Sequence, residues 1–559
     1  MKIYKGISGA EGISIGTIYY FSKIKNNEGN LTVGEAIVKA KEKLRKLYTI
    51  AKDKLGNDNA KIFEAYDMLL NDQAYISPII DAEKIGVAPC EAITNQSNKL
   101  ISLFENHKSE YMRQRSDDIK YVGDLLIDCI NGNDDIFDIP ENDKIILVAE
   151  ELTPADTLQM DKTNIVGFAT LRGGSTSHTV ILAKSLGIPA IVGIKDLNKN
   201  LNGKNAIMDA EKGELIINPE EKIINHYKNK LMEEKRKRDI INSFNNTVAK
   251  TSDGVRIYVL GNIGNIEDVK NNTLDNIDGV GLFRSEFLFS STNIKPTIEE
   301  QIISYSTVID VLHPKSVTIR TMDIGGDKKI DYLDMPEEDN PFLGNRGIRM
   351  CLLNKEIFKE QLKAIIISAS GKSVKILLPM ITTVEEIEIA KKIIKEVQSE
   401  LTVPYSKKVS VGMMIETPSS AINISSFVKY CDFFSIGTND LIQYITASDR
   451  GNEFVSNLYS PYNPAVIKVI FNVIKVASEN DKEISMCGDL AATTDMTALL
   501  LGLGLKKFSV PIPIVNMLKY TISKINLKEA EKMAKKILNT EREGEIKAII
   551  EKFNAELNI

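Results

Sequence analysis

The stretch VSVGMMIETPSSAINISSFVKYCDFFSIGTND, residues 409–440, contains two short apolar runs that each end in polar side chains. The first run ends at Glu416 and the second at Asn439 and Asp440. Short apolar runs bounded by turn residues indicate buried strands. Six more runs of this kind occur between residue 256 and residue 512. Four precede the quoted stretch, at 256–263, 279–287, 316–325 and 375–381, and two follow it, at 483–490 and 507–512. Helical patterns, such as the one at 383–401, lie between several of them.

Eight strand–helix units in about 280 residues are typical of a (β/α)8 barrel. We therefore expect residues 255–559 to form a TIM barrel. The active site of such a barrel lies at the carboxyl ends of its strands, so the residues that end each run carry the chemical information. Besides the three polar residues named above, Arg284, Arg320 and Cys487 lie at strand ends, and Arg346 and Arg450 lie in the loops that follow.

These residue types suit a small, highly anionic phosphorylated acid. The planar fork of arginine binds phosphate or carboxylate through two parallel hydrogen bonds and keeps its charge. Two carboxylates, such as Glu416 and Asp440, are what Mg²⁺ usually takes from a protein, with phosphate oxygens and water completing its shell. Any one of these charges could belong to a surface ion pair, but their recurrence at five strand ends favours a site.

A second candidate site lies in GGSTSHTVILAKSLGIPAIVG, residues 173–193, which holds His178, one of four histidines in the chain. The two glycines allow close approach of backbone N–H groups to a ligand, and the helix that begins here offers a seat for phosphate. Hydroxyl groups come from Ser175, Thr176, Ser177 and Thr179. A neutral histidine in this position could attack phosphorus. The alternative is a helix-capping segment with an incidental histidine.

The remaining segments predict a multidomain α/β protein. Residues 1–22 and 145–219 have short strand patterns and are expected to form one α/β domain that carries His178. Residues 23–144 have apolar residues at intervals of three and four, which predicts an inserted bundle of about four helices. The charge-rich segment 220–254 is expected to be a linker helix about which residues 1–219 swivel.

Composition narrows the function further. The net charge of −6 and the lack of a large basic block argue against nucleic acid or an anionic membrane as the main partner. The N-terminal residues have no apolar core of signal-peptide type, and no apolar run approaches the roughly 18 residues of a membrane span. Five widely spaced cysteines make a disulfide framework or structural zinc site unexpected, which favours a cytoplasmic location.

Several long motifs resemble those of enzyme I of the bacterial phosphotransferase system, the phosphoenolpyruvate–protein phosphotransferase family. In chain order they are GISGAEGISIG, EELTPADT, the His178 stretch, GVGLFRSEFLF, TIRTMDIGGDK, NPFLGNRGIRM, VGMMIETPSS, DFFSIGTNDLIQY, SDRGN and MCGDLA. The resemblance implies transfer of a phosphoryl group from phosphoenolpyruvate to His178 and then to a histidine of the phosphocarrier protein HPr, with release of pyruvate. This would be the first step of sugar uptake.

The resemblance also implies roles for the barrel residues. Phosphoenolpyruvate would be held by Arg284, Arg320, Arg450, Asn439 and Asp440, with Arg346 as a further phosphate contact. Glu416 and Asp440 would ligate Mg²⁺, and Cys487 would protonate the enolate. HPr would dock on the helical bundle near residues 60–80 and 105–125, and the barrel domain would form a homodimer.

The motifs depart from the family pattern at Leu171, Asp489 and Tyr66, where aspartate, glutamate and histidine are common. These departures bear on rates and partner affinity. The sequence leaves two alternatives to compare with this function. A phosphoenolpyruvate synthase or pyruvate phosphate dikinase would need a large ATP-binding domain, for which the chain before His178 offers no Gly-rich nucleotide loop. A regulatory phosphotransferase homologue that signals by its phosphorylation state remains the other alternative.

Overall fold

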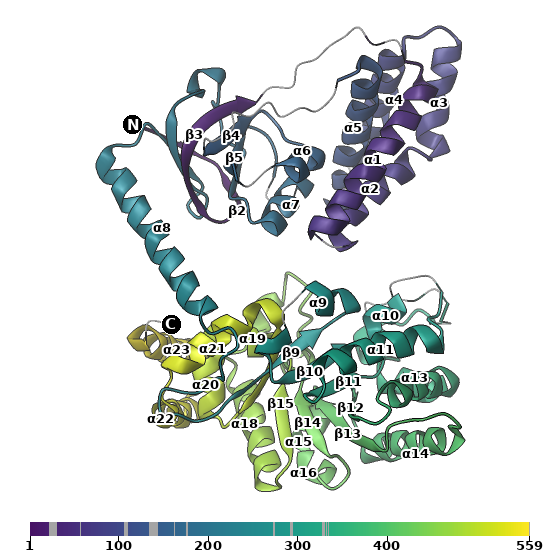
Figure 1. Cartoon of the computed structure of the whole chain (residues 1–559), viewed down its shortest axis with the longest axis vertical. Coiled ribbons are helices and arrows are strands. Elements are labelled where there is room, and N and C mark those ends of the chain that lie inside the picture. The colour runs from purple at the N-terminus through teal and green to yellow at the C-terminus, as the bar shows by residue number, and fades with distance from the viewer. Residues whose placement is uncertain are drawn as a thin grey trace. The chain divides into compact units, whose positions relative to one another are not determined.

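A computed structural model of the chain describes residues 1–21, 29, 31–55, 57–105, 110–133, 144–160, 163–174, 177–271, 274–290, 294–326, 330, 332–333 and 335–557. The chain divides into two compact units, residues 1–235 and 236–559 (Figure 1). Among the described residues, no helix has both the length and the apolar character that crossing a membrane requires.

The first unit contains an eight-stranded sheet in the order β1-β8-β7-β3-β4-β5-β6-β2. Strands β3 to β6 pair in parallel, while β1, β2, β7 and β8 pair antiparallel with their neighbours. The strands are Lys2–Lys5, Ile7–Ala10, Ile13–Phe21, Ile145–Ala149, Ile165–Thr170, Ala190–Val192, Asn205–Asp209 and Glu214–Ile217. The first 21 residues and residues 145–217 therefore share one sheet. Helices α6 (Pro154–Gln159) and α7 (His178–Leu186) and the short turn η1 (Lys199–Leu201) belong to the same part of the unit.

A helical bundle lies between β3 and β4 in the sequence. Its described helices are α1 Val33–Leu55, α2 Asn57–Leu69, α3 Gln73–Lys84, α4 Pro89–Glu105 and α5 Glu110–Asn131. In α1, the buried residues recur every three or four positions, at Val33, Ala36, Ala40, Leu44, Leu47 and Ala51, and they form one core with the other helices. The sequence predicted about four helices, whereas the described residues form five, and one of these, α3, contains Pro78, which opposes a helical prediction.

Helix α8 (Glu221–Asn242) begins within the first unit and continues past its boundary. Its first turns pack on the sheet, where Tyr227 lies in one apolar cluster with Ile13, Ile207 and Ile216. The Tyr227 hydroxyl also donates a hydrogen bond of 2.8 Å to the buried Asp209 at the end of β7. The helix expected between residues 220 and 254 therefore ends at Asn242. The expected boundaries of the four domains remain predictions.

The second unit is built on a closed barrel in which β9 to β16 follow one another and β16 pairs with β9. All eight pairings are parallel, which confirms the predicted (β/α)8 barrel. The strands are Tyr258–Ile263, Gly279–Arg284, Ser316–Arg320, Ser373–Leu378, Lys408–Ile415, Phe433–Ile436, Glu483–Met486 and Lys507–Pro511. Each predicted run overlaps one strand, and β12 and β13 begin two residues and one residue before their runs.

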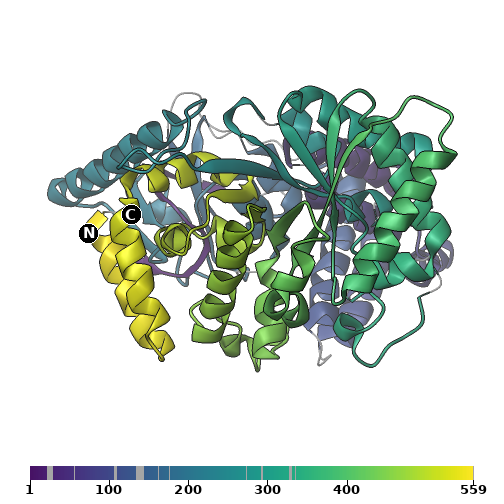
Figure 2. The same ribbon diagram turned by 90° about the horizontal axis from the view of Figure 1, so that it is seen from below.

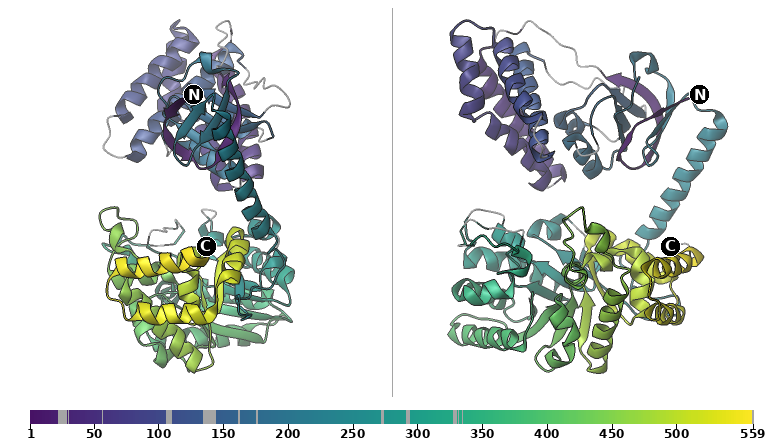
Figure 3. Two further views of the ribbon diagram at one scale, coloured as in Figure 1. Left: turned by 90° about the vertical axis from the view of Figure 1, so that its left-hand side faces the viewer. Right: turned by 180° about the vertical axis from the view of Figure 1, so that it is seen from behind.

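Helices surround these strands (Figure 1). They are α9 Ile266–Asn271, α10 Glu286–Ser290, α11 Ile298–Leu312, α12 Ile348–Leu353, α13 Lys355–Ser368, α14 Val384–Glu400, α15 Pro418–Ile422, α16 Ile424–Phe427, α17 Thr438–Thr446, α18 Pro464–Glu479, α19 Asp489–Ala492, α20 Thr497–Gly502, α21 Val515–Lys524, α22 Leu527–Leu538 and α23 Glu543–Leu557. The last two helices lie side by side (yellow in Figures 2 and 3). One core fills the space between strands and helices, because strands that are covered on both faces are apolar throughout.

Candidate active site

Strand register brings the predicted barrel residues to one rim. Arg284, the last residue of β10, is the direct neighbour of Arg320, the last residue of β11. Farther round, Ile415 pairs with Ile436, which in turn pairs with Met486. The residues that follow these three, Glu416, Gly437 and Cys487, therefore leave the barrel at the same level. Parallel strands place their carboxyl ends together, so the chemistry predicted from separate runs meets at this end of the barrel.

Arg346 joins the rim from the loop before α12 and is buried. Its guanidinium donates to both oxygens of Asp323, at 3.0 and 3.0 Å, and to both oxygens of Asp440, at 2.8 and 3.0 Å. Burial alone would lower the pKa of Arg346, but the charges of Asp323 and Asp440 raise it above its ordinary value. The sequence predicted Arg346 as a phosphate contact, whereas the structure gives its fork two carboxylate partners.

Arg320 is held in a similar way. It forms ion pairs with Glu286 and with Asp323, the latter at 3.1 Å, and its Nη1 lies 3.6 Å from Sδ of Met414. Burial opposes its charge, yet Glu286 and Asp323 raise the pKa of Arg320 above its ordinary value. The arginine is therefore a permanent buried cation that is preorganised by acids of the same rim.

Asp323 and Glu286 were missed by the sequence analysis. Asp323 lies three residues after Arg320, and Glu286 lies two residues after Arg284. Both acids lie in motifs that the sequence shows, MDIG and RSEF, just beyond the arginines that end the two strands. Both side chains are buried, and buried arginines need such acids because an unpaired buried charge is strongly destabilising.

Glu416 is fully buried, with an exposed fraction of 0%. One carboxylate oxygen accepts a hydrogen bond of 2.6 Å from the Met380 N–H, and no donor among the described residues reaches its Oε2. Burial, together with the charges of Asp440 and Asp323, raises the pKa of Glu416 to about 8. A buried carboxylate oxygen without a donor, near a second carboxylate, is the arrangement expected where a cation is to be bound.

The sequence predicted Glu416 and Asp440 as ligands of Mg²⁺, and this pair of carboxylates is a donor set that Mg²⁺ accepts. Within the described residues, no three His, Cys, Asp or Glu side chains gather into a metal-holding group. Mg²⁺ commonly takes only one or two carboxylates from a protein and completes its shell with substrate phosphate and water.

Cys487 follows β15 and has an exposed fraction of 2%. It belongs to a small apolar cluster inside the barrel with Leu282, Leu377, Met414 and Phe433. Its thiol lies 3.7 Å from the Ile436 carbonyl oxygen. Burial raises the pKa of Cys487 above its ordinary value, so the thiol keeps its proton at neutral pH. This is the state that a proton donor requires.

The other predicted barrel residues lie around this centre. Asn439, at the start of α17, exchanges two hydrogen bonds with Asp489: its side-chain N–H donates at 2.9 Å and its side-chain oxygen accepts from the Asp489 N–H at 2.8 Å. Arg284 is half-buried, and Arg450 is exposed in the loop after α17. The Arg450 N–H donates to the Gln443 side chain at 3.2 Å, which fixes the start of that loop.

His178 is the first residue of α7, in the other unit, and its side chain is 38% exposed. Gly173, with φ of 111°, turns the chain into this helix in a conformation that favours glycine. The predicted hydroxyl donors Ser175 and Thr176 lie outside the described residues. Nδ1 of His178 lies 3.7 Å from a carboxylate oxygen of Asp118, a residue of α5 that the sequence analysis did not single out.

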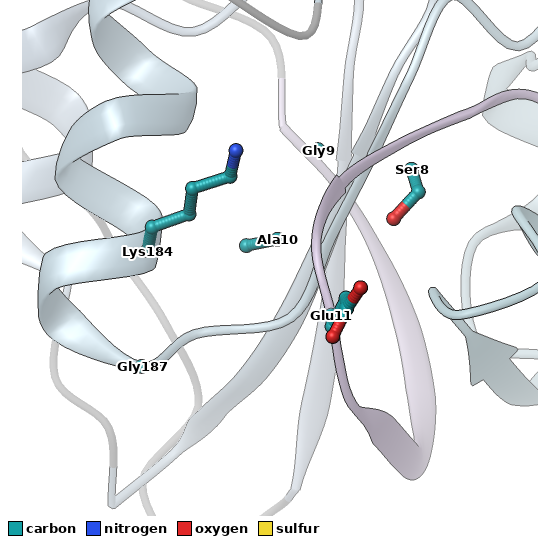
Figure 4. A pocket seen from close by; sticks show the side chains of 6 residues that line it. All are labelled: Ser8, Gly9, Ala10, Glu11, Lys184 and Gly187. Carbon is teal, nitrogen blue, oxygen red and sulfur yellow. The ribbon is translucent and has the colours of Figure 1, made fainter. Parts of the chain in front are cut away.

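A pocket of about 470 Å³ lies at the other end of α7 (Figure 4). It is bounded by Ser8, Gly9, Ala10, Glu11, Lys184 and Gly187. None of the predicted site residues lines this pocket, which is formed by strand β2 with the residue that follows it and by the end of helix α7 with its capping glycine.

Comparison with known proteins identifies the family. Models of PEP-utilising enzymes match residues 5–115 (N-terminal), 141–213 (mobile domain) and 238–527 (PEP-binding domain). The chain is 38% identical to the phosphoenolpyruvate-protein phosphotransferase of Bacillus subtilis, over 98% of this chain and 99% of that relative. The chain belongs to the phosphoenolpyruvate-protein phosphotransferase family. The Buchnera aphidicola member is 40% identical over 92% of this chain and 91% of its own length. The Staphylococcus carnosus member is 35% identical over 99% of both.

Membership of the phosphoenolpyruvate-protein phosphotransferase family confirms the resemblance carried by the motifs. The multidomain α/β fold and the assignment as an enzyme are confirmed as well. The predicted function, phosphoenolpyruvate-dependent phosphotransfer, is the activity for which this family is named. The roles of the individual side chains remain predictions.

Proposed function

We propose that the chain transfers the phosphoryl group of phosphoenolpyruvate to its own His178 and then to a histidine of the phosphocarrier protein HPr. The observation that carries this proposal is the barrel rim, where the buried cation Arg320, the unsatisfied carboxylate of Glu416 and the protonated thiol of Cys487 lie at the carboxyl ends of the alternate strands β11, β13 and β15. Cations, a metal-binding carboxylate and an acid are the groups that this reaction needs.

Substrate binding follows from the charges of the rim. Arg284, Arg320 and Arg450 would hold the phosphate and carboxylate groups of phosphoenolpyruvate, with Asn439 and Asp440 beside them. Arg346 would become a phosphate contact on exchanging one of its carboxylate partners for substrate. When bound to Glu416 and Asp440, Mg²⁺ would neutralise negative charge on the phosphate and on the developing enolate. Phosphoryl transfer depends mainly on such positioning and charge neutralisation.

Residues of the chain supply the nucleophile and the proton that the chemical step requires. A ring nitrogen of His178 donates its lone pair to phosphorus, and the bond between phosphorus and the enol oxygen breaks, with its electron pair leaving on that oxygen. The resulting enolate takes a proton at carbon from the Cys487 thiol, which gives pyruvate and a thiolate. Solvent then returns a proton to the thiolate. The raised pKa of Cys487 makes its thiolate a strong base that regains the proton readily.

His178 and the barrel rim belong to different units. Because His178 must first meet the substrate and then meet the carrier, we propose that residues 1–219 swivel about the segment that follows. HPr would dock on the helical bundle near residues 60–80 and 105–125, of which 106–109 lie outside the described residues. We further propose a homodimer formed by the barrel domain and a cytoplasmic location, in keeping with five cysteines that form no disulfide.

The test is a complete transfer assay. The chain, phosphoenolpyruvate, Mg²⁺ and HPr are mixed, and pyruvate and phosphorylated HPr are measured together. We expect both products from the parent and neither from His178→Ala. His226→Ala is the matched control, since it removes another exposed histidine of the first unit and should leave both products unchanged. Pyruvate without phosphorylated HPr, together with rapid transfer to a regulatory carrier, would instead support the regulatory alternative.

A further inference from the structure

A carboxylate that the proposed mechanism does not use faces His178. Asp118 lies on α5 of the helical bundle, and its side chain is 10% exposed. Its Oδ1 is buried, accepts no hydrogen bond from the described residues and lies 3.7 Å from Nδ1 of His178. Burial raises the pKa of Asp118, while the nearby charge of His178 acts in the opposite direction.

Such a carboxylate needs an explanation. A buried carboxylate oxygen with no donor loses its hydration without compensation, which is unfavourable for folding. The other side chains that influence its titration are Arg115, which favours the charged form, and Asp117, which opposes it. Among the described residues, the imidazole of His178 is a group whose ring N–H can supply the missing hydrogen bond. A distance of 3.7 Å exceeds that of a formed hydrogen bond, but a carboxylate this close to Nδ1 already favours a proton on that nitrogen over one on Nε2.

We propose that Asp118 is a positioning residue for His178. It accepts a hydrogen bond from Nδ1–H and so keeps the proton on that nitrogen, which leaves the lone pair on Nε2 free to attack phosphorus. This inference rests on the proposed phosphoryl transfer. Neutral histidine carries its proton on either nitrogen, and the partner of one nitrogen decides which form is present. The nucleophilic atom of His178 is then set by a residue of the helical bundle.

The Asp118 carboxylate also stabilises the positive charge that develops on the His178 ring during the reaction. When Nε2 forms its bond to phosphorus, Nδ1 keeps its proton and the ring gains positive character. A carboxylate beside Nδ1 stabilises this developing charge in the same way that the aspartate of a Ser-His-Asp triad stabilises its imidazolium. No proton passes to Asp118, and the phosphoryl group is later lost from Nε2 to the acceptor, which restores the neutral ring.

The first readout needs no substrate. Ring nitrogen chemical shifts of ¹⁵N-histidine-labelled parent protein, measured at mildly alkaline pH, report the tautomer of each histidine. The chain has four histidines, and His178→Ala identifies the signals of His178. We expect the Nδ1–H form to predominate in the parent and to lose its predominance in Asp118→Asn. Predominance of the Nε2–H form in the parent would overturn the proposal.

The second readout is the rate of a single turnover with phosphoenolpyruvate. We expect Asp118→Asn to slow phosphorylation of His178 by roughly ten- to a hundredfold, less than the loss seen for a triad aspartate because His178 is partly exposed. Asp118→Glu keeps the charge and should recover most of the rate. Asp128→Asn, farther along α5, is the matched control and should react at the rate of the parent.

A merely structural role predicts a different outcome. Because the buried Asp118 carboxylate opposes folding, the midpoint of thermal unfolding should not fall in Asp118→Asn, whereas a structural residue would lower it. A parent-like rate in Asp118→Asn would overturn the proposal. If Asp118→Asn did not fold, the spectrum of the parent and the rate of Asp118→Glu would decide. A parent that does not react with phosphoenolpyruvate would refute the proposed function alone, because the tautomer would still be measurable.

Discussion

At the scale of the residue, burial gives Cys487 its chemistry. Burial raises the pKa of its thiol, so the thiol stays protonated through neutral pH and loses its proton only as the pH rises through that raised pKa. We predict that Cys487→Ala lowers kcat for pyruvate formation by roughly a hundredfold while KM for phosphoenolpyruvate stays close to that of the parent. Steady-state kinetics of pyruvate release measure both constants.

The matched control for this prediction is Cys431→Ala. Cys431 is also buried, but it precedes β14 and therefore lies at the opposite end of the strand from the rim. The kcat of the Cys431→Ala variant should equal that of the parent. In the parent, kcat should hold through neutral pH and decline in the alkaline range. A Cys487→Ala enzyme with the parent's kcat would contradict the role of the thiol as proton donor.

Arg346 is a residue on which stability and substrate binding depend together. Its guanidinium is shared between the buried carboxylates of Asp323 and Asp440. Arg346→Met would leave Asp440 without its arginine partner and Asp323 with Arg320 alone, so we predict a loss of about 3–5 kcal/mol in the free energy of unfolding of the barrel. Urea titration followed by circular dichroism measures this loss. Arg349→Met, which removes hydrogen bonds to the carbonyl groups of Leu343 and Gly344, should have a smaller effect.

The sequence predicted the residues of the rim well where they end a strand. Arg284, Arg320, Glu416 and Cys487 follow this rule because the barrel brings all strand ends together. It did not predict Asp323 or Asp118. Asp323 was missed because pairing between loops depends on side-chain direction, and Asp118 was missed because its partner His178 lies 60 residues away on another element. Such contacts arise from packing, for which a single sequence gives no local signal.

At the scale of the element, the barrel is held together at its other end by a charged cluster. Glu483, the first residue of β15, accepts from Lys375 of β12 at 2.7 Å with both oxygens and pairs with Lys507 of β16 at 3.0 Å. Burial alone would raise the pKa of Glu483, but the two lysines lower it. A carboxyl group whose pKa is lower in the folded chain stabilises the fold above its unfolded pKa.

We predict that Glu483→Gln lowers the free energy of unfolding by about 1–2 kcal/mol at neutral pH. This difference from the parent should vanish as the pH falls through the lowered pKa of Glu483, because the parent then loses the same charge. Urea titrations across the acidic range measure it. Glu551→Gln, which removes a surface pair with Lys547, should match the parent at every pH. An equal loss for Glu483→Gln at neutral and acidic pH would show that the charge is unimportant.

The periodicity of the sequence predicts some helices and strands better than others. The barrel strands were recognisable because parallel strands that are buried on both faces give continuous apolar runs. Helix α14 was equally clear, since Ile387, Ala390, Ile394 and Val397 recur with helical spacing. Helix α3 was not predicted. Its Pro78 argues against a helix, and its stability comes from packing of Tyr75, Ile76 and Ile79 and from the Asp72 cap.

At the scale of the whole molecule, each unit has its own hydrophobic core. We therefore predict that a fragment of residues 1–235 folds alone and accepts a phosphoryl group at His178 from phosphorylated HPr. It should not accept one from phosphoenolpyruvate, because the residues predicted to bind that substrate lie in the barrel. Mass measurement of the fragment after each incubation tests both statements. Phosphorylation of the fragment by phosphoenolpyruvate would contradict the prediction, because it would show that the fragment binds this substrate without the barrel.

The central claim is that phosphoenolpyruvate phosphorylates His178, and intact mass measurement tests it most directly. The whole chain is incubated with phosphoenolpyruvate and Mg²⁺ and kept alkaline, since phosphohistidine survives under those conditions. We predict one added phosphoryl group on the parent and on His226→Ala, and none on His178→Ala. A folded parent that gains no phosphoryl group, or a His178→Ala variant that still gains one, would contradict the account.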